Sequence, residues 1–238
     1  MALRFLRFEG RATFHGMGGE VFVVGFLVLV VVLVVLGVLA ERKRREALRR
    51  LAGRLGFRFR QERDRGLASE CAFLDRLRRG SNRYAFNIME GEYRGSPVLV
   101  FDYHYETHST DSKGRSRTHH HYLCCYLMRL PKRFPELTVA REGLLSKIAQ
   151  AFGYDDIDFE SHEFSRKFCV RSKDKRFAYD FCHARMMEYL LANPDLSVEV
   201  EGNALAFVFS GRLKPGTVEG NLQRLAEVRA LMPEYLFE

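Results

Sequence analysis

The sequence lacks the short motifs that mark many nucleotide-binding and hydrolytic sites. Its 238 residues contain neither of the glycine-rich phosphate-binding patterns, G-x-x-x-x-G-K-[ST] and G-x-G-x-x-G. The nucleophile pattern G-x-S-x-G and the zinc-protease pattern H-E-x-x-H are missing as well. These absences argue against the folds whose chemistry depends on those loops and helices.

Cysteine is scarce, and its spacing matches neither a disulfide scaffold nor a zinc motif. The five residues are Cys71, Cys124, Cys125, Cys169 and Cys182. An odd number of thiols without scaffold-like spacing is typical of a reducing cytosol. Cys124 and Cys125 are adjacent, so on a strand they point to opposite faces and do not chelate together. We interpret both as small, half-buried apolar residues.

Most of the chain has no net positive charge, although the formal net charge of the whole is +8. The segment from Glu41 to Arg79 holds 14 basic and 6 acidic residues, which accounts for the whole excess, and the remaining residues balance at 24 against 24. Nucleic-acid binding requires a basic face that extends over a domain. The concentration of charge in one segment makes nucleic acid an unlikely partner.

One long uncharged run interrupts this polar sequence between Val21 and Ala40. Seventeen of its twenty residues are Val, Leu or Phe. A helix of twenty residues is about 30 Å long, which matches the hydrocarbon core of a bilayer. The run exceeds the usual apolar region of a cleaved signal peptide, and the arginines that follow it resist translocation. We therefore predict a transmembrane helix over residues 21–40 that is not cleaved.

The flanking charges predict the orientation of this helix. The preceding tail, residues 1–20, offers three arginines, whereas a basic juxtamembrane helix over residues 41–55 offers seven Lys or Arg. Positive residues accumulate on the cytoplasmic side, so we expect the tail outside and residues 56–238 in the cytoplasm. Six side chains at this flank are candidates for binding anionic lipid headgroups: Arg42, Lys43, Arg44, Arg45, Arg49 and Arg50.

The sequence of residues 56–238 predicts an α+β fold, in which an antiparallel sheet consists of a meander and a C-terminal hairpin and helices pack on it. A stripe of Leu48, Leu51, Ala52 and Leu55 is expected to pack on this domain or to contact the membrane. The expected strands are residues 57–60, 84–89, 98–107, 119–130, 168–171, 196–200 and 205–209. The expected helices are residues 66–77, 144–152, 174–191 and 215–232. A weak seam is expected near residues 153–163.

Five of the eight histidines fall between His104 and His121. Alternate side chains of a strand share a face, so Asp102, His104 and Glu106 line up. If the hairpin folds symmetrically about Lys113, Glu106 lies opposite His120, and the trio His104, Glu106 and His120 converges. Nitrogen and oxygen donors of this kind suit zinc or another transition metal.

The hairpin also allows other interpretations. A one-residue slip would bring His119 and His121 to that face instead, and the sequence does not decide the register. The histidines also suit exposed cross-strand pairs that need no ligand, or pH sensing. The trio is thus a candidate metal site, and no catalytic residue or other cofactor is predicted.

Three segments resemble a family of bacterial membrane proteins that carry one span and a cytoplasmic domain of unknown function. They are FDYHYETHSTDSKGRSRTHHHY, DIDFESHEFSRKF and FAYDFCHARMMEYLLANP. The resemblance covers about residues 56–236 and implies one folded domain at a bacterial inner membrane. The resemblance transfers no activity.

The expected function is therefore a membrane-anchored, non-enzymatic module that binds a protein, lipid or small ligand. The alternative is a metal sensor or metal-dependent enzyme built on the histidine hairpin.

Overall fold

The computed structural model describes residues 17–112, 114–141 and 157–238, and it divides into two compact units, Met1–Arg44 and Arg45–Glu238. The predicted helix over residues 144–152 lies outside the described ranges, as does part of the expected seam at 153–163. The larger unit combines an antiparallel sheet with packed helices, which confirms the predicted α+β class.

The first unit consists of most of helix α1, Met17–Arg54. Within it, the stretch from Val23 is long and apolar enough to cross a membrane, and none of its most apolar window is buried. Side chains from Val23 to Leu39 are exposed. A row of exposed Val, Leu and Phe is unfavourable in water and favourable in lipid, so the helix has the properties expected of the predicted span.

The sheet of the second unit has six strands in the order β1-β2-β3-β4-β5, and β6 also pairs with β4. Their bounds are β1 Arg58–Arg60, β2 Ser81–Tyr93, β3 Ser96–Thr110, β4 Ser116–Arg141, β5 Phe168–Ser172 and β6 Val198–Ser210. The long strand β4 is the centre of the sheet. It pairs with β3 over its first half and with β5 at its end, while β6 accompanies it from Leu123 to Val139.

Two predictions about strands were wrong. The strand expected over residues 119–130 continues to Arg141, through Pro131 and Pro135. Both prolines lie where the register between β4 and β6 is irregular, which is a position where a missing N–H is tolerated. The expected C-terminal hairpin over residues 196–209 is the single strand β6, in which Gly202 adopts a φ of +57° opposite Phe134.

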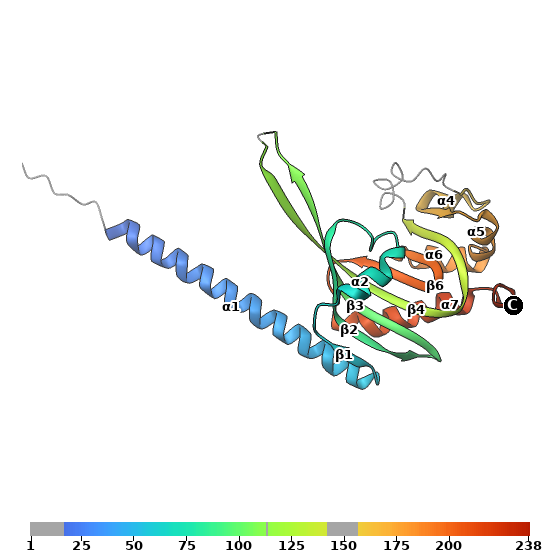
Figure 1. Cartoon of the computed structure of the whole chain (residues 1–238), viewed down its shortest axis with the longest axis horizontal. Coiled ribbons are helices and arrows are strands. Elements are labelled where there is room, and N and C mark those ends of the chain that lie inside the picture. Colours follow the sequence, from blue (N-terminus) through green and yellow to red (C-terminus); the bar gives the residue numbers. More distant parts are fainter. Residues whose placement is uncertain (1–16, 113, 142–156) are drawn as a thin grey trace, which may run out of the picture. The chain divides into compact units, whose positions relative to one another are not determined.

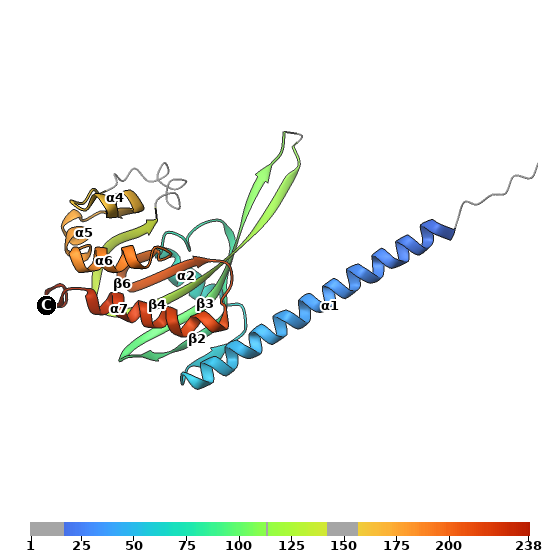
Figure 2. The ribbon, with the colours of Figure 1, turned by 180° about the vertical axis from the view of Figure 1, so that it is seen from behind.

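Helices and short turns cover both faces of the sheet. Figure 1 shows α2 over one face, and Figure 2 shows α7 over the other. Their bounds, with the remaining helices, are α2 Arg65–Glu70, η1 Cys71–Phe73, α4 His162–Lys167, α5 Lys175–Phe181, α6 Ala184–Ala192, η2 Pro215–Thr217, α7 Val218–Leu231 and η3 Glu234–Phe237. The predicted helices over 66–77 and 174–191 are each divided into two shorter elements.

Successive side chains along the strands point to opposite faces of the sheet, and each face carries its own hydrophobic core. Phe101, Tyr103 and Cys125 pack beneath α2 and η1. Val100, Cys124 and the larger set of apolar side chains pack on the face that carries α5, α6 and α7. All five cysteines lie in the described ranges as buried thiols, and burial raises the pKa of Cys124 to about 12. This confirms the interpretation of Cys124 and Cys125 as packing residues.

The end of α1 belongs to the larger core. Leu48, Leu51 and Ala52 are buried there, and Leu55 is partly buried against it. Of the two alternatives for this stripe, packing on the domain is the one observed. The folded domain therefore begins before residue 56, inside the helix that continues from the apolar stretch.

Candidate metal centre

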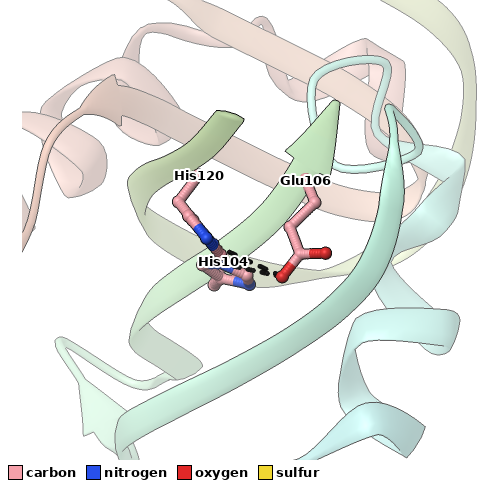
Figure 3. Close-up of side chains that lie close together, drawn as sticks. All are labelled: His104, Glu106 and His120. Atoms are coloured by element: carbon pink, nitrogen blue, oxygen red, sulfur yellow. Dashed lines mark hydrogen bonds and ion pairs between the residues drawn. The ribbon is translucent and has the colours of Figure 1, made fainter. Parts of the chain in front are cut away.

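The β3–β4 hairpin adopts the symmetric register that brings the candidate trio together. Glu106 is the cross-strand partner of His120, and His104 is the partner of Tyr122. This register places His104, Glu106 and His120 on one face of the ribbon, and Figure 3 shows their polar atoms converging. The alternative slip, which would have brought His119 and His121 to this face, does not occur.

The three donor atoms are spaced as ligands of one ion. His104 Nε2 lies 3.1 Å from His120 Nδ1 and 3.9 Å from Glu106 Oε1, and His120 Nδ1 lies 3.3 Å from the same carboxylate oxygen. A triangle with these sides has a circumscribed radius of about 2.0 Å, and zinc–nitrogen distances are about 2.0–2.1 Å. An ion about 0.5 Å above the plane of the three atoms would lie about 2.1 Å from each of them, which leaves a fourth, tetrahedral position on that side.

The backbone of Asn82 selects the tautomer of His104. Its carbonyl oxygen lies 3.2 Å from His104 Nδ1, and a carbonyl only accepts, so the ring carries its proton on Nδ1. The lone pair of the neutral ring is then on Nε2, which faces Glu106 and His120. A hydrogen bond from the other ring nitrogen to a backbone carbonyl is the usual outer support of a metal-bound histidine.

Asn82 reaches this position because β2 is irregular there. Its φ is +46°, and the register between β2 and β3 shifts between Ser81 and Tyr84. Asn tolerates this left-handed conformation better than most residues. Its side-chain amide also donates to Glu106 Oε1 at 2.7 Å, so one residue orients two of the three candidate ligands.

Aromatic side chains surround His104 and exclude water from it. The ring of Tyr84 stacks on the imidazole with 4.5 Å between ring centroids, and Tyr122 lies at 5.2 Å. The side chain of His104 is 2% exposed. This burial lowers the pKa of His104, an effect that Glu106 partly opposes. The neutral imidazole, which is the form that binds metal, is therefore favoured.

The site opens to solvent on the side of His120. The side chain of Glu106 is 15% exposed and that of His120 is 56% exposed, so burial decreases from His104 outward. Three protein ligands with one accessible side leave room for water or another ligand in a fourth position. That arrangement is typical of metal sites that bind exchangeable ligands, whereas structural zinc sites are closed by four protein ligands.

The other histidines of the hairpin have partners outside the trio. His108 contacts Ser81 and Thr118, and His119 contacts Ser109. His121 lies near Thr107 and stacks on Tyr105. These contacts are cross-strand pairs of the kind expected on an exposed ribbon. The structure thus divides the five histidines into a convergent pair, two exposed residues, His108 and His119, and the half-buried His121.

Two residues that shape the site are not predicted by the sequence patterns. A left-handed residue inside a strand, such as Asn82, has no reliable local signal. Gly80 is required because a Cβ at this position would collide with the carbonyl oxygen of Glu106 and would lie 2.7 Å from Tyr105 Cδ2. Its φ of +65° also favours glycine.

The basic flank beyond the apolar stretch is only partly available to headgroups. Arg42, Lys43, Arg49 and Arg50 are exposed, although Arg50 also pairs with Glu46 at 3.4 Å. Arg44, by contrast, pairs with Glu41 at 3.0 Å and its side chain is 17% exposed. Arg45 is half-buried. Four of the six predicted lipid contacts therefore present their charges to solvent.

No protein-family model matches the sequence, and no curated protein matches it. Among solved structures, the crystal structure of the mycobacterial trehalose monomycolate transport factor A, TtfA, is similar, with a TM-score of 0.55. The alignment covers 80% of this chain and 95% of TtfA at 14% sequence identity. At this level of identity the likeness shows a shared fold and does not transfer a function.

These findings define the class of protein. An apolar N-terminal helix long enough to cross a bilayer, joined to an α+β domain, fits a membrane protein. The domain carries a convergent set of two imidazoles and one carboxylate on a β-ribbon.

Proposed function

We propose that this protein is a membrane-anchored binding module whose domain holds a transition-metal ion at His104, Glu106 and His120. The observation that carries the proposal is the spacing of the three donor atoms, which places one point about 2.0 Å from each of them. The buried, tautomer-selected His104 supports it. Histidines that only formed exposed cross-strand pairs would require neither the spacing of the donor atoms nor the burial of His104.

Zinc suits this donor set best. Two neutral imidazoles and one carboxylate are borderline donors that zinc accepts in tetrahedral geometry, with the fourth position left to water or to a ligand. Harder ions such as magnesium and calcium prefer sites built only from oxygen atoms. Iron and manganese share the imidazole and carboxylate chemistry and are the alternatives that a metal analysis would separate.

A metal-dependent enzyme is the second candidate, favoured by the accessible side at His120. Three protein ligands and one open position also occur in hydrolytic zinc sites. The absence of the known catalytic sequence motifs favours the binding module. A non-enzymatic role at a membrane is compatible with the description of the structural neighbour TtfA as a transport factor.

We place the domain on the cytoplasmic side of a bacterial inner membrane, with the N-terminal tail outside. The support is the asymmetry of Lys and Arg across the apolar helix. The exposed residues Arg42, Lys43, Arg49 and Arg50 would attract anionic headgroups at up to about 1 kcal/mol each near the surface. Nucleic acid is not proposed as a partner.

Metal analysis of the whole chain tests the proposal. The untagged protein is purified in a neutral detergent without chelator, because residues 48–55 belong to the core and a shorter fragment would lose them. We expect close to one zinc per chain. The double variant His104→Ala, His120→Ala should lose the metal, and the matched variant His108→Ala, His119→Ala should retain it.

Two outcomes would overturn the proposal. One is a folded wild-type protein that remains metal-free even after incubation with zinc, iron or manganese. The other is equal loss of metal in both double variants, which would indicate weak binding by surface histidines in general. Circular dichroism of each variant establishes that the domain is folded when the metal is measured.

A further inference from the structure

The opposite side of the β3–β4 ribbon borders a cavity that the proposed metal site does not explain. Its volume is about 370 Å³, which is within the range that holds a small organic ligand. Side chains from four separate segments line it, and those with hydrogen-bonding groups include Arg76, Arg79, Tyr105, His121, Ser197 and Ser210. His120 reaches its rim.

The polar part of this lining is rich in hydrogen-bond donors. Two guanidinium groups line the cavity together with two tyrosines, two histidines and two serines, beside the apolar Leu123 and Ala140. Guanidinium groups match the planar oxygen pairs of phosphates and carboxylates. A cavity with this composition is suited to an acceptor-rich anion and poorly suited to a cation or an apolar ligand.

Arg76 is held in place before any ligand arrives. Its guanidinium donates to the carbonyl oxygen of Val208 and, at 3.2 Å, to Ser210 Oγ. Arg79 is tethered through Asp75, to which it donates at 2.8 Å. These contacts reduce the rotational freedom of both side chains, so less ordering is needed when an anion binds.

We propose that this cavity binds the phosphate group of a small organic phosphate, with Arg76 and Arg79 contacting the charged oxygens. A phosphate offers enough acceptor oxygens for these donors at once. The same group occurs in soluble phosphate esters and in the headgroups of anionic lipids. The inference goes beyond the proposed metal function and does not require a bound metal.

Binding measurements on the whole chain in neutral detergent test this inference, with a chelator present so that a metal-bound anion cannot contribute. Two probes separate the sources of phosphate: glycerol 3-phosphate in solution, and phosphatidic acid in mixed micelles. Saturable binding of glycerol 3-phosphate alone would assign a soluble ester, and saturable binding of the lipid alone would assign a headgroup. Either result supports the site if the variants below respond as expected.

The variants distinguish binding in this cavity from non-specific attraction of the anion to basic residues. Arg79→Gln should weaken binding by about tenfold, the effect of one lost charge-assisted hydrogen bond. Arg78→Gln is the matched control, because Arg78 also donates to Asp75 at 2.8 Å and does not line the cavity. Its affinity should stay within about twofold of wild type.

Circular dichroism and the unfolding midpoints of Arg78→Gln and Arg79→Gln establish that each variant is folded when its affinity is measured. The whole inference fails if neither probe binds saturably, or if Arg78→Gln and Arg79→Gln lose equal affinity.

Discussion

Asn82 contributes to the candidate metal centre through both its backbone and its side chain. Its carbonyl accepts from His104 Nδ1, and its amide donates to Glu106 Oε1. The first contact depends on the left-handed backbone, which glycine also adopts, and only the second depends on the side chain. Replacement by glycine therefore separates the two contributions.

We expect Asn82→Gly to keep the metal stoichiometry and to lower zinc affinity by about tenfold, because outer-shell partners of metal ligands typically contribute at least that much. Competition with a chromophoric chelator measures the affinity. Arg65→Gln is the control, because Arg65 contacts Asn82 Oδ1 at 3.2 Å from the exposed side and does not touch a ligand. An unchanged affinity in Asn82→Gly would show that Glu106 is oriented without the amide.

Glu199 is a buried carboxyl that interacts with Arg76, one of the residues that line the proposed phosphate cavity. Burial raises its pKa to about 7, an effect that Arg76 and the backbone N–H groups of Asp75 and Arg76 only partly oppose. The folded state therefore holds a proton at pH values where the unfolded chain, with a pKa near 4.5, has released it. The contribution of Glu199 to the free energy of unfolding is greatest below about pH 4.5, and it is lost as the pH rises through 7.

The variant Glu199→Gln should remove this dependence. Between pH 4.5 and pH 8, the unfolding free energy of wild type should fall relative to the variant by about 3 kcal/mol, which corresponds to the shift in pKa at 1.36 kcal/mol per unit. Denaturant titrations of both proteins at several pH values measure the difference in unfolding free energy. Protonation changes of the other groups are the same in both proteins and therefore cancel. Parallel pH profiles would contradict the prediction.

At the scale of elements, the β3–β4 hairpin determines which histidines converge. Its register is set where the ribbon enters the core. Phe101 pairs with Cys125 and Tyr103 pairs with Leu123, and all four are buried on one face. A slip by one residue would exchange the side chains that fill the two cores and would separate the buried Asp102 from its partners Asn87 and Leu213, at a cost far above that of a longer loop.

A glycine inserted after Gly114 should therefore leave zinc stoichiometry and affinity unchanged within about twofold, because one more loop residue changes the closure entropy little. A glycine inserted between Tyr105 and Glu106 should abolish binding, since it moves Glu106 to the opposite face or out of register. Metal analysis of the two insertions gives the comparison. Loss of metal in the loop insertion would mean that the turn, and not the core, sets the register.

At the scale of the whole molecule, the apolar helix and its flanking charges decide where the domain works. The apolar stretch is exposed in the structure, and the exposed basic residues follow it directly along α1. A metal site and a phosphate cavity on the cytoplasmic side would meet cytosolic ligands and the headgroups of the inner leaflet.

Reporter fusions check this orientation. We expect a fluorescent protein fused to the C-terminus to fluoresce in cells and alkaline phosphatase at the same position to be inactive, because positive flanks are retained in the cytoplasm. Alkaline phosphatase fused to the N-terminal tail, with its own export competence tested separately, should give the opposite result. An active C-terminal phosphatase would reverse the topology and move both proposed sites outside.

Several features of this protein could be predicted from short stretches of sequence. The span follows from the apolar run of residues 21–40, and the trio His104, Glu106 and His120 follows from two-residue periodicity and a symmetric turn. The buried stripe Leu48, Leu51 and Ala52 follows from helical spacing. In each case neighbouring residues carry the signal, because helix and strand periodicity determine which side chains share a face.

Tertiary structure decided the rest. The hairpin register depends on the core pairs around Phe101, and the support of His104 depends on a left-handed Asn82 in the neighbouring strand. The continuous strand β6 exists because β4 offers it a partner along most of its length. Arg76 and Ser197, far apart in the sequence, line one cavity only because the sheet brings β6 next to the turn after α2. These contacts join distant segments through packing and pairing, which local periodicity does not encode.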